Sequence, residues 1–485
     1  MTRYKIAALL ATAGVVAPAF ATNGMDQAGY GPIAEAMGGT SMAYDNGAAA
    51  AINNPATLGL MASGSRRFDI GFGDLRPAAS ANGQASTATD FFMPGLGYVR
   101  KDGSLAWGVA LMAQGGMGTD YSSGNFWGTL SPFNPTGNAA LNSLVTQGQS
   151  LRNMSQVGVG RVMFPLAYNV NSDFTIGGSI DYVWAGLDIK WLIDGSHFRD
   201  MVAPLGGQQV FAQGSGSMIT TMLSIPGFAG LGYGYFDLEK GGQFSQQAKG
   251  YGWAGNLGFT YKASPVLTVG GVYHGKTSLS DLETSGSGAS ITMAALILPS
   301  PGAFAQTITG KAIVRNFQWP ETFGLGISYE ANPAWTINAD YKRINWASVM
   351  KNFNLSFQAD SSPTNGAFAG KNLDIVYFQN WKDQNVLQLG AAYKYTDATT
   401  IRFGVNVGNN PIPDQYVSPM FPAVMKDHYM AGFGYALNKA SSIDAAFVFA
   451  PKVKVTNNWS AVGGSNQNIS LGTDFSFQIM YAYHY

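Results

Sequence analysis

The strongest constraint on the fold of this chain is the strict alternation of side chains in its last residues. Large apolar residues occupy every second position, at Phe475, Phe477, Ile479, Tyr481, Tyr483 and Tyr485. The positions between them hold Ser476, Gln478, Met480, Ala482 and His484. A period of two belongs to a β-strand, and one apolar face opposite a small or polar face is typical of a strand in a membrane barrel.

The same alternation recurs along the chain. Apolar and small residues alternate over 105–112, 253–261, 335–342 and 428–437, and Tyr and Trp are frequent near the ends of these segments. A soluble β-sandwich also alternates, but it seldom places so many Tyr and Trp at strand ends. Aromatic residues at both ends of the strands fit the girdles of a membrane barrel.

Short turn segments join these strands into pairs. They lie at residues 101–103, 171–173, 263–265, 331–333, 397–398 and 438–440. A first strand from about Arg66 and the last strand then complete an even number of about fourteen strands. The sequence therefore predicts an all-β fold, a transmembrane antiparallel β-barrel over residues 63–485, with the tight turns on the periplasmic side.

Composition supports this fold class and excludes others. The formal net charge is zero, only 12% of the residues are charged, and no cysteine is present. A neutral chain does not favour a nucleic-acid partner, which would call for a basic excess. Few charges also disfavour a pore lined by charged rings. After the N-terminal leader, no stretch of about 20 apolar residues that could form a membrane-spanning helix is found.

The N-terminus has the pattern of a secretory signal peptide. A basic start is followed by an apolar run from Ile6 to Val16 and by the small-residue site Ala19-Phe20-Ala21. We predict removal of residues 1–21 and a mature chain that begins at Thr22. The alternative, an N-terminal membrane anchor, is disfavoured because the apolar run is too short to span a bilayer.

Three long connections, at 117–155, 193–248 and 284–307, are predicted to be extracellular. Two stretches within them, residues 217–232 and 289–305, are unusually apolar for loops in water. One interpretation is that they pack on each other as a cap over the barrel. The other is that this packing also leaves a hydrophobic groove where an apolar ligand first binds.

Residues 22–62 precede the first strand and show no alternation. They are rich in small residues and turn formers, including Gly38-Gly39, and a short helix is expected over 47–52, ended by Asn54-Pro55. Alanines, methionines and Ile52 indicate a segment that packs against something. A disordered tail is the alternative, but the composition is neither charged nor repetitive.

This segment resembles the N-terminal hatch of the FadL/TodX family of outer-membrane transporters for long-chain fatty acids and hydrocarbons. The resemblance lies in the pattern TNGM…GYG…AMGGT…AY, followed by Asn54-Pro55-Ala56. It implies that residues 22–62 form a plug in the lumen, and that Gly38, Gly39 and the Asn54-Pro55-Ala56 triplet take part in gating. It further implies a kink in the third strand that opens a side passage through the wall.

The third predicted strand ends in residues 114–120, QGGMGTD, which are similar to the kink region of that family. Gly115, Gly116 and Gly118 are the residues expected at the lateral opening, because glycines let a backbone bend inward and pair with a plug. The alternatives are the beginning of a loop or an ordinary bulge.

Basic residues facing the lumen hold the carboxylate in members of the family that bind fatty acids. Arg161, with Lys311 or Arg315, is the candidate here. Arg161 is equally consistent with a structural role as partner of Asp181 or of the plug. The ligand therefore stays open between a fatty acid and an aromatic or aliphatic hydrocarbon.

The hypothesis for function is passive uptake of small hydrophobic molecules, which bind above the plug, displace it and leave sideways into the membrane. An enzyme is disfavoured: there is no nucleophile elbow, and the four histidines show no metal-ligand spacing. An open diffusion porin or a surface receptor is the other alternative.

No metal and no cofactor are predicted. Expected partners are the hydrophobic ligand, outer-membrane lipid with lipopolysaccharide and, during biogenesis, the barrel-assembly machinery, since a final aromatic residue resembles its recognition signal. A monomer in the outer membrane of a Gram-negative cell is expected.

Overall fold

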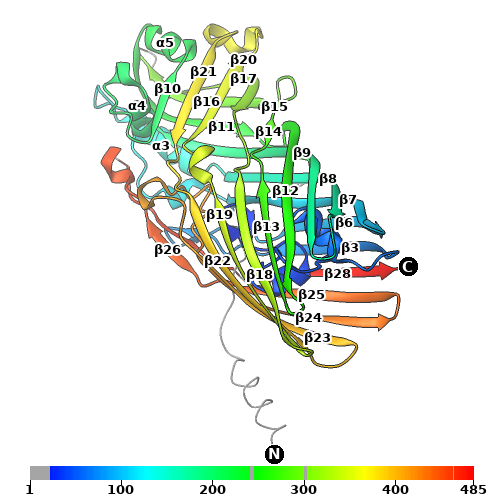
Figure 1. The fold of residues 1–485 in the computed structure, drawn as a ribbon. Coiled ribbons are helices and arrows are strands. Elements are labelled where there is room, and N and C mark those ends of the chain that lie inside the picture. Colours follow the sequence, from blue (N-terminus) through cyan, green and yellow to red (C-terminus); the bar gives the residue numbers. More distant parts are fainter. Residues whose placement is uncertain (1–21, 241–244, 300–302, 463, 474) are drawn as a thin grey trace, which may run out of the picture.

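The computed structural model describes residues 22–240, 245–299, 303–462, 464–473 and 475–485 (Figure 1). The predicted signal peptide, residues 1–21, lies outside the described residues. Within them, antiparallel strands form a ladder that closes where the last strand pairs with the first. The ring passes through β3 (Arg66–Leu75), β6 (Phe91–Asp102), β7 (Leu105–Tyr121), β8 (Asn153–Asn169), β9 (Phe174–Asp194), β12 (Ala248–Ser264), β13 (Leu267–His274), β18 (Thr322–Asn332), β19 (Trp335–Ile344), β22 (Gln384–Lys394), β23 (Thr399–Gly408), β24 (Asp427–Asn438), β25 (Ser441–Phe449) and β28 (Ser476–His484).

The predicted alternation is confirmed along these strands. On β7, the side chains of Leu105, Trp107, Val109 and Leu111 are 36–40% exposed on the outer surface, while Ala106 and Ala110 between them are buried. On β28, the tyrosines point outward and Met480 and Ala482 are buried inside. The barrel therefore presents apolar side chains to its surroundings, as a lipid-facing surface requires.

The short turns also lie where they were predicted. They join β6 to β7, β8 to β9, β12 to β13, β18 to β19, β22 to β23 and β24 to β25. Among the described residues, no helix has the length and apolar character needed to cross a membrane. Figure 1 shows the C-terminus at one end of the barrel and helices α3 (Ala140–Gln149), α4 (Gly195–Met201) and α5 (Ser217–Ser224) at the other.

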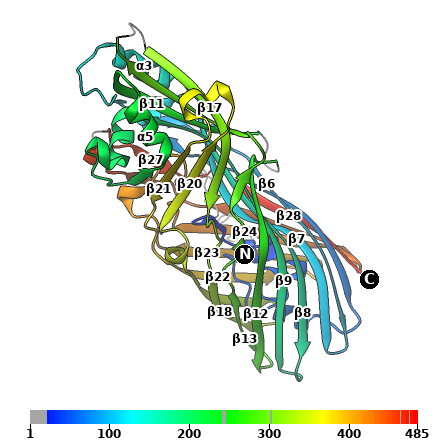
Figure 2. The same ribbon diagram turned by 90° about the horizontal axis from the view of Figure 1, so that it is seen from above.

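At the end with the helices, the sheet extends beyond the ring (Figure 2). Up to Leu187, β9 pairs with β12, and from Ile189 onward it pairs with β11 (Phe228–Leu238) instead. The ladder continues through β16 (Ala289–Ile297), β17 (Ala303–Arg315), β20 (Asn352–Ala359), β21 (Asn372–Phe378) and β10 (Ala212–Ser215). Short strands β14 (Ser278–Leu279) and β15 (Leu282–Thr284) connect this extension to β12.

The two apolar stretches of the long connections are therefore not irregular loops. Residues 217–232 form α5 and the first part of β11, and 289–305 contain β16 and the start of β17, with 300–302 outside the described residues. The prediction that the two stretches pack on each other is confirmed, because β11 and β16 are paired from Phe228↔Ile297 to Asp237↔Ser290. Their apolar residues are explained by burial in this sheet.

The remaining elements at this end are short. A small sheet joins β4 (Ser80–Ala81), β5 (Gln84–Ala85), β26 (Val453–Thr456) and β27 (Asn468–Leu471). The 3-10 helices are η3 (Gly124–Trp127), η4 (Ala203–Leu205), η5 (Trp346–Ser348), η6 (Pro363–Phe368), η7 (Asp414–Tyr416) and η8 (Trp459–Val462).

Residues 22–62, called here the N-terminal segment, lie inside the ring. The segment contains β1 (Thr22–Asn23), β2 (Asp26–Gln27), α2 (Pro32–Ala36), η1 (Gly47–Ala51) and η2 (Pro55–Leu60), and nearly all of its residues are buried. It bonds to strands around the ring: the backbone N–H groups of Ser41 and Met42 donate to Asp340 on β19, and that of Ala48 donates to Asp69 on β3. The helix expected over 47–52 is present as the 3-10 helix η1.

Glycines on the inner face of the barrel make room for this segment. A Cβ atom at Gly177, Gly258, Gly270, Gly390 or Gly404 would overlap atoms of residues 37–56. The high glycine content of the chain, 62 residues, is thus partly explained by backbone-to-backbone contact between the wall and the N-terminal segment.

Candidate functional site

The wall of the barrel is interrupted between β6 and β7. These strands pair from Asp102↔Leu105 to Gly95↔Met112, and there the pairing ends although β7 continues to Tyr121. β6 stays paired with β3 as far as Phe91↔Leu75. Pro94 stands where β6 separates from β7, which fits a proline, because it has no N–H to donate and is confined to unpaired edges of sheets.

The edge of β7 that β6 leaves is satisfied by the N-terminal segment. Asp26 pairs with Gly115, and the N–H of Gly116 donates to the carbonyl of Met25 at 3.1 Å. The side chain of Gln27 donates to the carbonyl of Ala113 at 2.8 Å. A backbone without water must find its partners within the protein, so the segment completes the ladder at this point.

The glycines predicted at this opening each lie in close backbone contact. A Cβ at Gly115 would overlap the carbonyl oxygen of Met25, one at Gly116 that of Val157, and one at Gly118 that of Ser155. The ladder with β8 shifts register between Ala113 and Gly115 and continues to Tyr121. The alternative that a loop begins here is therefore wrong, whereas the bulge interpretation describes the local geometry correctly.

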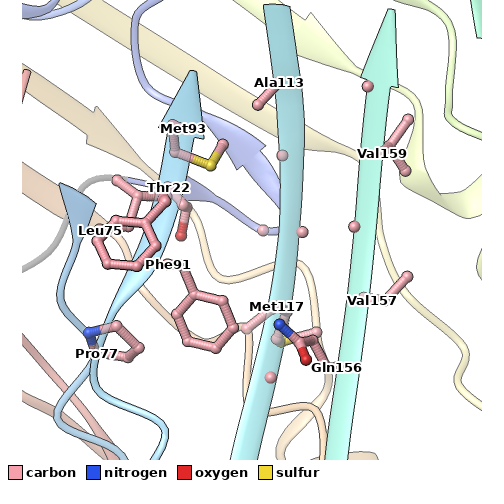
Figure 3. A pocket seen from close by; sticks show the side chains of 18 of the residues that line it. Thr22, Leu75, Pro77, Phe91, Met93, Ala113, Met117, Gln156, Val157 and Val159 are labelled. Carbon is pink, nitrogen blue, oxygen red and sulfur yellow. The ribbon is translucent and has the colours of Figure 1, made fainter. Parts of the chain in front are cut away.

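An apolar cavity of about 330 Å³ lies at this interruption (Figure 3). Its walls include Phe91 and Met93 on β6, Ala113 on β7, and Val157 and Val159 on β8. Among the described residues that line it there is no Asp, Glu, Lys, Arg or His. An apolar cavity of about 150 Å³ is sufficient to bind benzene, so this volume accommodates a molecule larger than a single aromatic ring.

A buried polar cluster lies next to the cavity and holds the N-terminal segment. The carboxylate of Asp26 accepts from Nζ of Lys342 on β19 at 2.5 Å, from the hydroxyl of Tyr30 at 2.5 Å, and from Nε1 of Trp319 at 3.3 Å. Trp319 also lies against Gly115, with Cη2 3.1 Å from where a Cβ would stand. The short strand β2 thus forms a backbone bridge with β7, and the side chain of its Asp26 binds Lys342 on β19.

The residues predicted to gate the lumen lie deeper in the N-terminal segment. Gly38 and Gly39 follow α2 with φ angles of 74° and 85°, and a side chain at Gly38 would overlap backbone atoms of β22 and β23. Asn54 is fully buried: Oδ1 accepts from the N–H of Ala56 at 3.1 Å and Nδ2 donates to the carbonyls of Met42 and Phe259.

Pro55 begins η2, and Ala56 packs against Gly177 of β9. Neither these two residues nor Gly38, Gly39 and Asn54 line the apolar cavity. Their contacts fix the segment to β9, β12, β22 and β23, whereas the cavity is formed at β6, β7 and β8.

The predicted carboxylate-binding residues are engaged in other contacts. Arg161 is buried and donates to Asp181 at 2.8 Å and to Gln114 at 2.6 Å. Lys311 is paired with Glu283 at 2.5 Å. Arg315 lies 3.6 Å from Asp281, between β14 and β15, and donates to Ser356 on β20 at 2.9 Å. The structure does not bring the three together, and none lines the apolar cavity.

Two histidines face the N-terminal segment. His274 Nε2 lies 3.1 Å from the carbonyl oxygen of Asn53, and His428 Nε2 accepts from the N–H of Thr22 at 3.1 Å. Within the described ranges, no group of three or more His, Cys, Asp or Glu residues is arranged to hold a metal ion.

Sequence reasoning missed several residues of this region. Pro94 carried a usable signal, since a proline in an otherwise regular strand indicates an edge. The ion pair of Asp26 with Lys342 joins positions more than 300 residues apart, and no local sequence pattern signals it. The cavity walls from β6 and β8 were missed too, because their side chains are ordinary strand residues.

Comparison with known proteins gives one family. Residues 8–480 match the family model described as "Outer membrane protein transport protein (OMPP1/FadL/TodX)". A long-chain fatty acid transport protein of Escherichia coli O6:H1 is 24% identical over 328 residues, which cover 64% of either chain, less than two thirds of that relative's length.

Solved structures agree over most of the chain. The toluene transporter TodX of P. putida superimposes with a TM-score of 0.75 and 27% identity, over 94% of this chain and 99% of TodX. The toluene transporter TbuX of Ralstonia pickettii gives a TM-score of 0.69 and 29% identity, over 94% of this chain and 98% of TbuX.

Proposed function

The chain belongs to the outer membrane protein transport family that includes FadL and TodX, and on this premise we propose that it takes up small hydrophobic molecules through the cavity at the β6–β7 interruption. It is an outer-membrane β-barrel, and the family is one of transport proteins rather than enzymes. The observation that carries the proposal is the 330 Å³ apolar cavity, placed where the wall ladder is broken.

The route is proposed to run sideways. Phe92 of β6 and Leu111 of β7 line the cavity and are 42% and 36% exposed on the outer surface of the barrel. A hydrophobic molecule in the cavity gains nothing by continuing into the periplasm, because water is a poor solvent for it and the bilayer core is a good one. Movement of the N-terminal segment away from Gly115 and Gly116 would widen the cavity towards the lumen, and we assign the gate to this contact.

An open porin is the second candidate, and the N-terminal segment argues against it. Buried residues of this segment contact strands around the inner face of the ring, among them Ala48 at Asp69 of β3, Ser41 at Asp340 of β19 and Glu35 at Gln478 of β28. We expect little ion conductance in a planar bilayer; a large, steady conductance would favour the porin. The ring closes within one chain, which supports a monomer as the working unit.

The test fills the cavity from Ala113, whose backbone carbonyl is still there after the substitution to accept from Gln27. Ala113→Phe places a phenyl ring in the cavity and removes roughly half of its volume, since about 150 Å³ holds one benzene. Val109→Phe, on the outer face of the same strand, is the matched control. Uptake of labelled toluene and labelled oleate is measured in cells that lack their own transporter.

We expect Ala113→Phe to reduce uptake strongly and Val109→Phe to leave it near the wild-type rate, at equal amounts of folded barrel. Equal uptake by both variants would contradict transport through this cavity. A bulky residue at Gly115 would be a less suitable test, because any side chain there also displaces Met25.

A further inference from the structure

Thr22 stands at the boundary between the N-terminal segment and the apolar cavity. It lines the cavity, and in Figure 3 it lies on the side of Leu75 and Met93, across from Val157 and Val159. Only 8% of its surface is exposed. Its backbone nitrogen donates to Nε2 of His428 at 3.1 Å, so both the nitrogen and its partner lie within the barrel.

The partner histidine can accept from this nitrogen but cannot donate. Nδ1 of His428 lies 3.3 Å from Oδ1 of Asn406, and both side chains are fully buried. An amide oxygen only accepts, so Nδ1 carries the hydrogen and Nε2 presents its lone pair. His428 therefore takes one hydrogen from the nitrogen of Thr22 and adds no positive charge of its own.

Signal-peptide removal changes the chemistry at this point. The Ala19-Phe20-Ala21 site predicts that Thr22 is the first residue of the mature chain. Its nitrogen is then an α-amino group, which is positively charged at neutral pH when hydrated and has three hydrogens. Only one of them is needed for His428.

The described lining of the cavity offers this ammonium group no counter-ion. No carboxylate lines the cavity among the described residues, and the nearby carboxylate of Asp26 is occupied by Lys342, Tyr30 and Trp319. An unpaired buried charge is costly, and a bound anion would remove the cost. The remaining polar side chains of the lining, such as Gln156 and Gln246, are neutral.

We propose that the α-amino group of Thr22 is the anchor for the head group of a hydrophobic carboxylic acid bound in this cavity. The carboxylate bonds to the ammonium group, and the tail lies among Phe91, Val157 and Val159. This rests on the proposed function, since it assigns a substrate class to the same cavity. It also places a cation at a cavity from which Arg161, Lys311 and Arg315 are absent.

The test compares one polypeptide with and without its α-amino group. In a Thr22→Gln variant, the N-terminal glutamine is converted to pyroglutamate by a glutaminyl cyclase on the unfolded chain, which is then refolded. The cyclised sample has lost the amine, and the uncyclised sample keeps it with the same residue. Intact mass measures both the cleavage site and the extent of cyclisation.

Binding of decanoate and of decanol is measured in lipid nanodiscs, with empty nanodiscs as the blank for partition into lipid. We expect cyclisation to weaken decanoate binding about ten- to hundredfold, the loss typical of a hydrogen bond to a charged group, and to change decanol binding less than twofold. Both samples carry glutamine at position 22, so the comparison isolates the loss of the amine from the change of side chain.

Three results would overturn the proposal while leaving hydrophobic uptake intact: equal decanoate binding with and without the amine, an equal loss of both ligands on cyclisation, or a mature N-terminus at another residue. If the wild-type chain bound neither ligand above the blank, the proposed function itself would fail. The outcomes are distinguishable because decanol reports on the cavity and decanoate on the amine.

Discussion

Replacing Gly115 by alanine tests whether the N-terminal segment completes the barrel wall. The added Cβ would overlap the carbonyl oxygen of Met25 and stand 3.1 Å from Cη2 of Trp319. The overlap involves backbone, which cannot rotate away, so β1 and β2 must move off the edge of β7. The hydrogen bond from Gly116 N–H to Met25, 3.1 Å long, is then lost.

The expected magnitude follows from that lost bond. The N–H of Gly116 is left facing an apolar cavity, and an unsatisfied buried donor costs about 1–3 kcal/mol. This corresponds to a roughly 5- to 150-fold shift from the docked to the undocked segment. The barrel itself should be unaffected, because β7 keeps its ladder with β8 from Gly115↔Val159 to Tyr121↔Asn153 on its other edge.

Hydrogen exchange followed by mass spectrometry measures the effect in separate peptides. Protection of residues 22–30 should fall by this factor, and in the peptide covering 105–121 the amide of Gly116 should lose protection with them. The other amides of that peptide and the temperature of unfolding should stay at their wild-type values. Gly95→Ala is the matched control, since it lies on the neighbouring strand and no atom stands within 4 Å of its added Cβ. Unchanged protection of residues 22–30 in Gly115→Ala would refute the argument that this contact docks the segment.

Three further predictions separate structural from ligand-binding roles. Lys342→Met leaves the buried carboxylate of Asp26 without its cation and should destabilise the fold by about 3–5 kcal/mol. Adding Asp26→Asn to Lys342→Met removes the unpaired charge and should recover most of the lost stability. Thermal unfolding in detergent measures both effects. Arg161→Met should lower the unfolding temperature for the same reason but leave decanoate affinity unchanged, and a tenfold loss of that affinity would restore Arg161 as a ligand. Asn54→Ala removes the cap of η2 and should cost about 1–2 kcal/mol, seen as faster exchange in residues 53–60 with no change in cavity binding.

The strands of the barrel could be predicted from the sequence because the pattern that identifies each strand lies within its own residues. The alternation over residues 105–112 tells which face meets lipid, and the turns at 331–333 and 438–440 tell where strands reverse. Both are local patterns, the alternation with a period of two, and the closed ring repeats them. The apolar stretches at 217–232 and 289–305 were recognised as packing together, but their strands were missed, because apolar runs without alternation do not distinguish a strand from a loop.

Only part of the candidate site could be predicted from the sequence. Gly115, Gly116 and Gly118 marked the interruption, since glycines in a strand indicate close approach of another backbone. That the approaching backbone is Met25 and Asp26 was not readable, and neither was the pairing of Arg161 with Asp181 rather than with a ligand.

By itself, the sequence determined that this chain is a membrane barrel, because alternation and turns are properties of neighbouring residues. The resemblance of residues 22–62 to the hatch of a known family implied that this segment lies in the lumen. Only the tertiary structure decided where the wall opens and what surrounds the cavity. β6, β7, β8 and the first residues of the N-terminal segment meet there from positions far apart in the chain. Contacts between such positions depend on how the whole ring closes, and no local pattern records them.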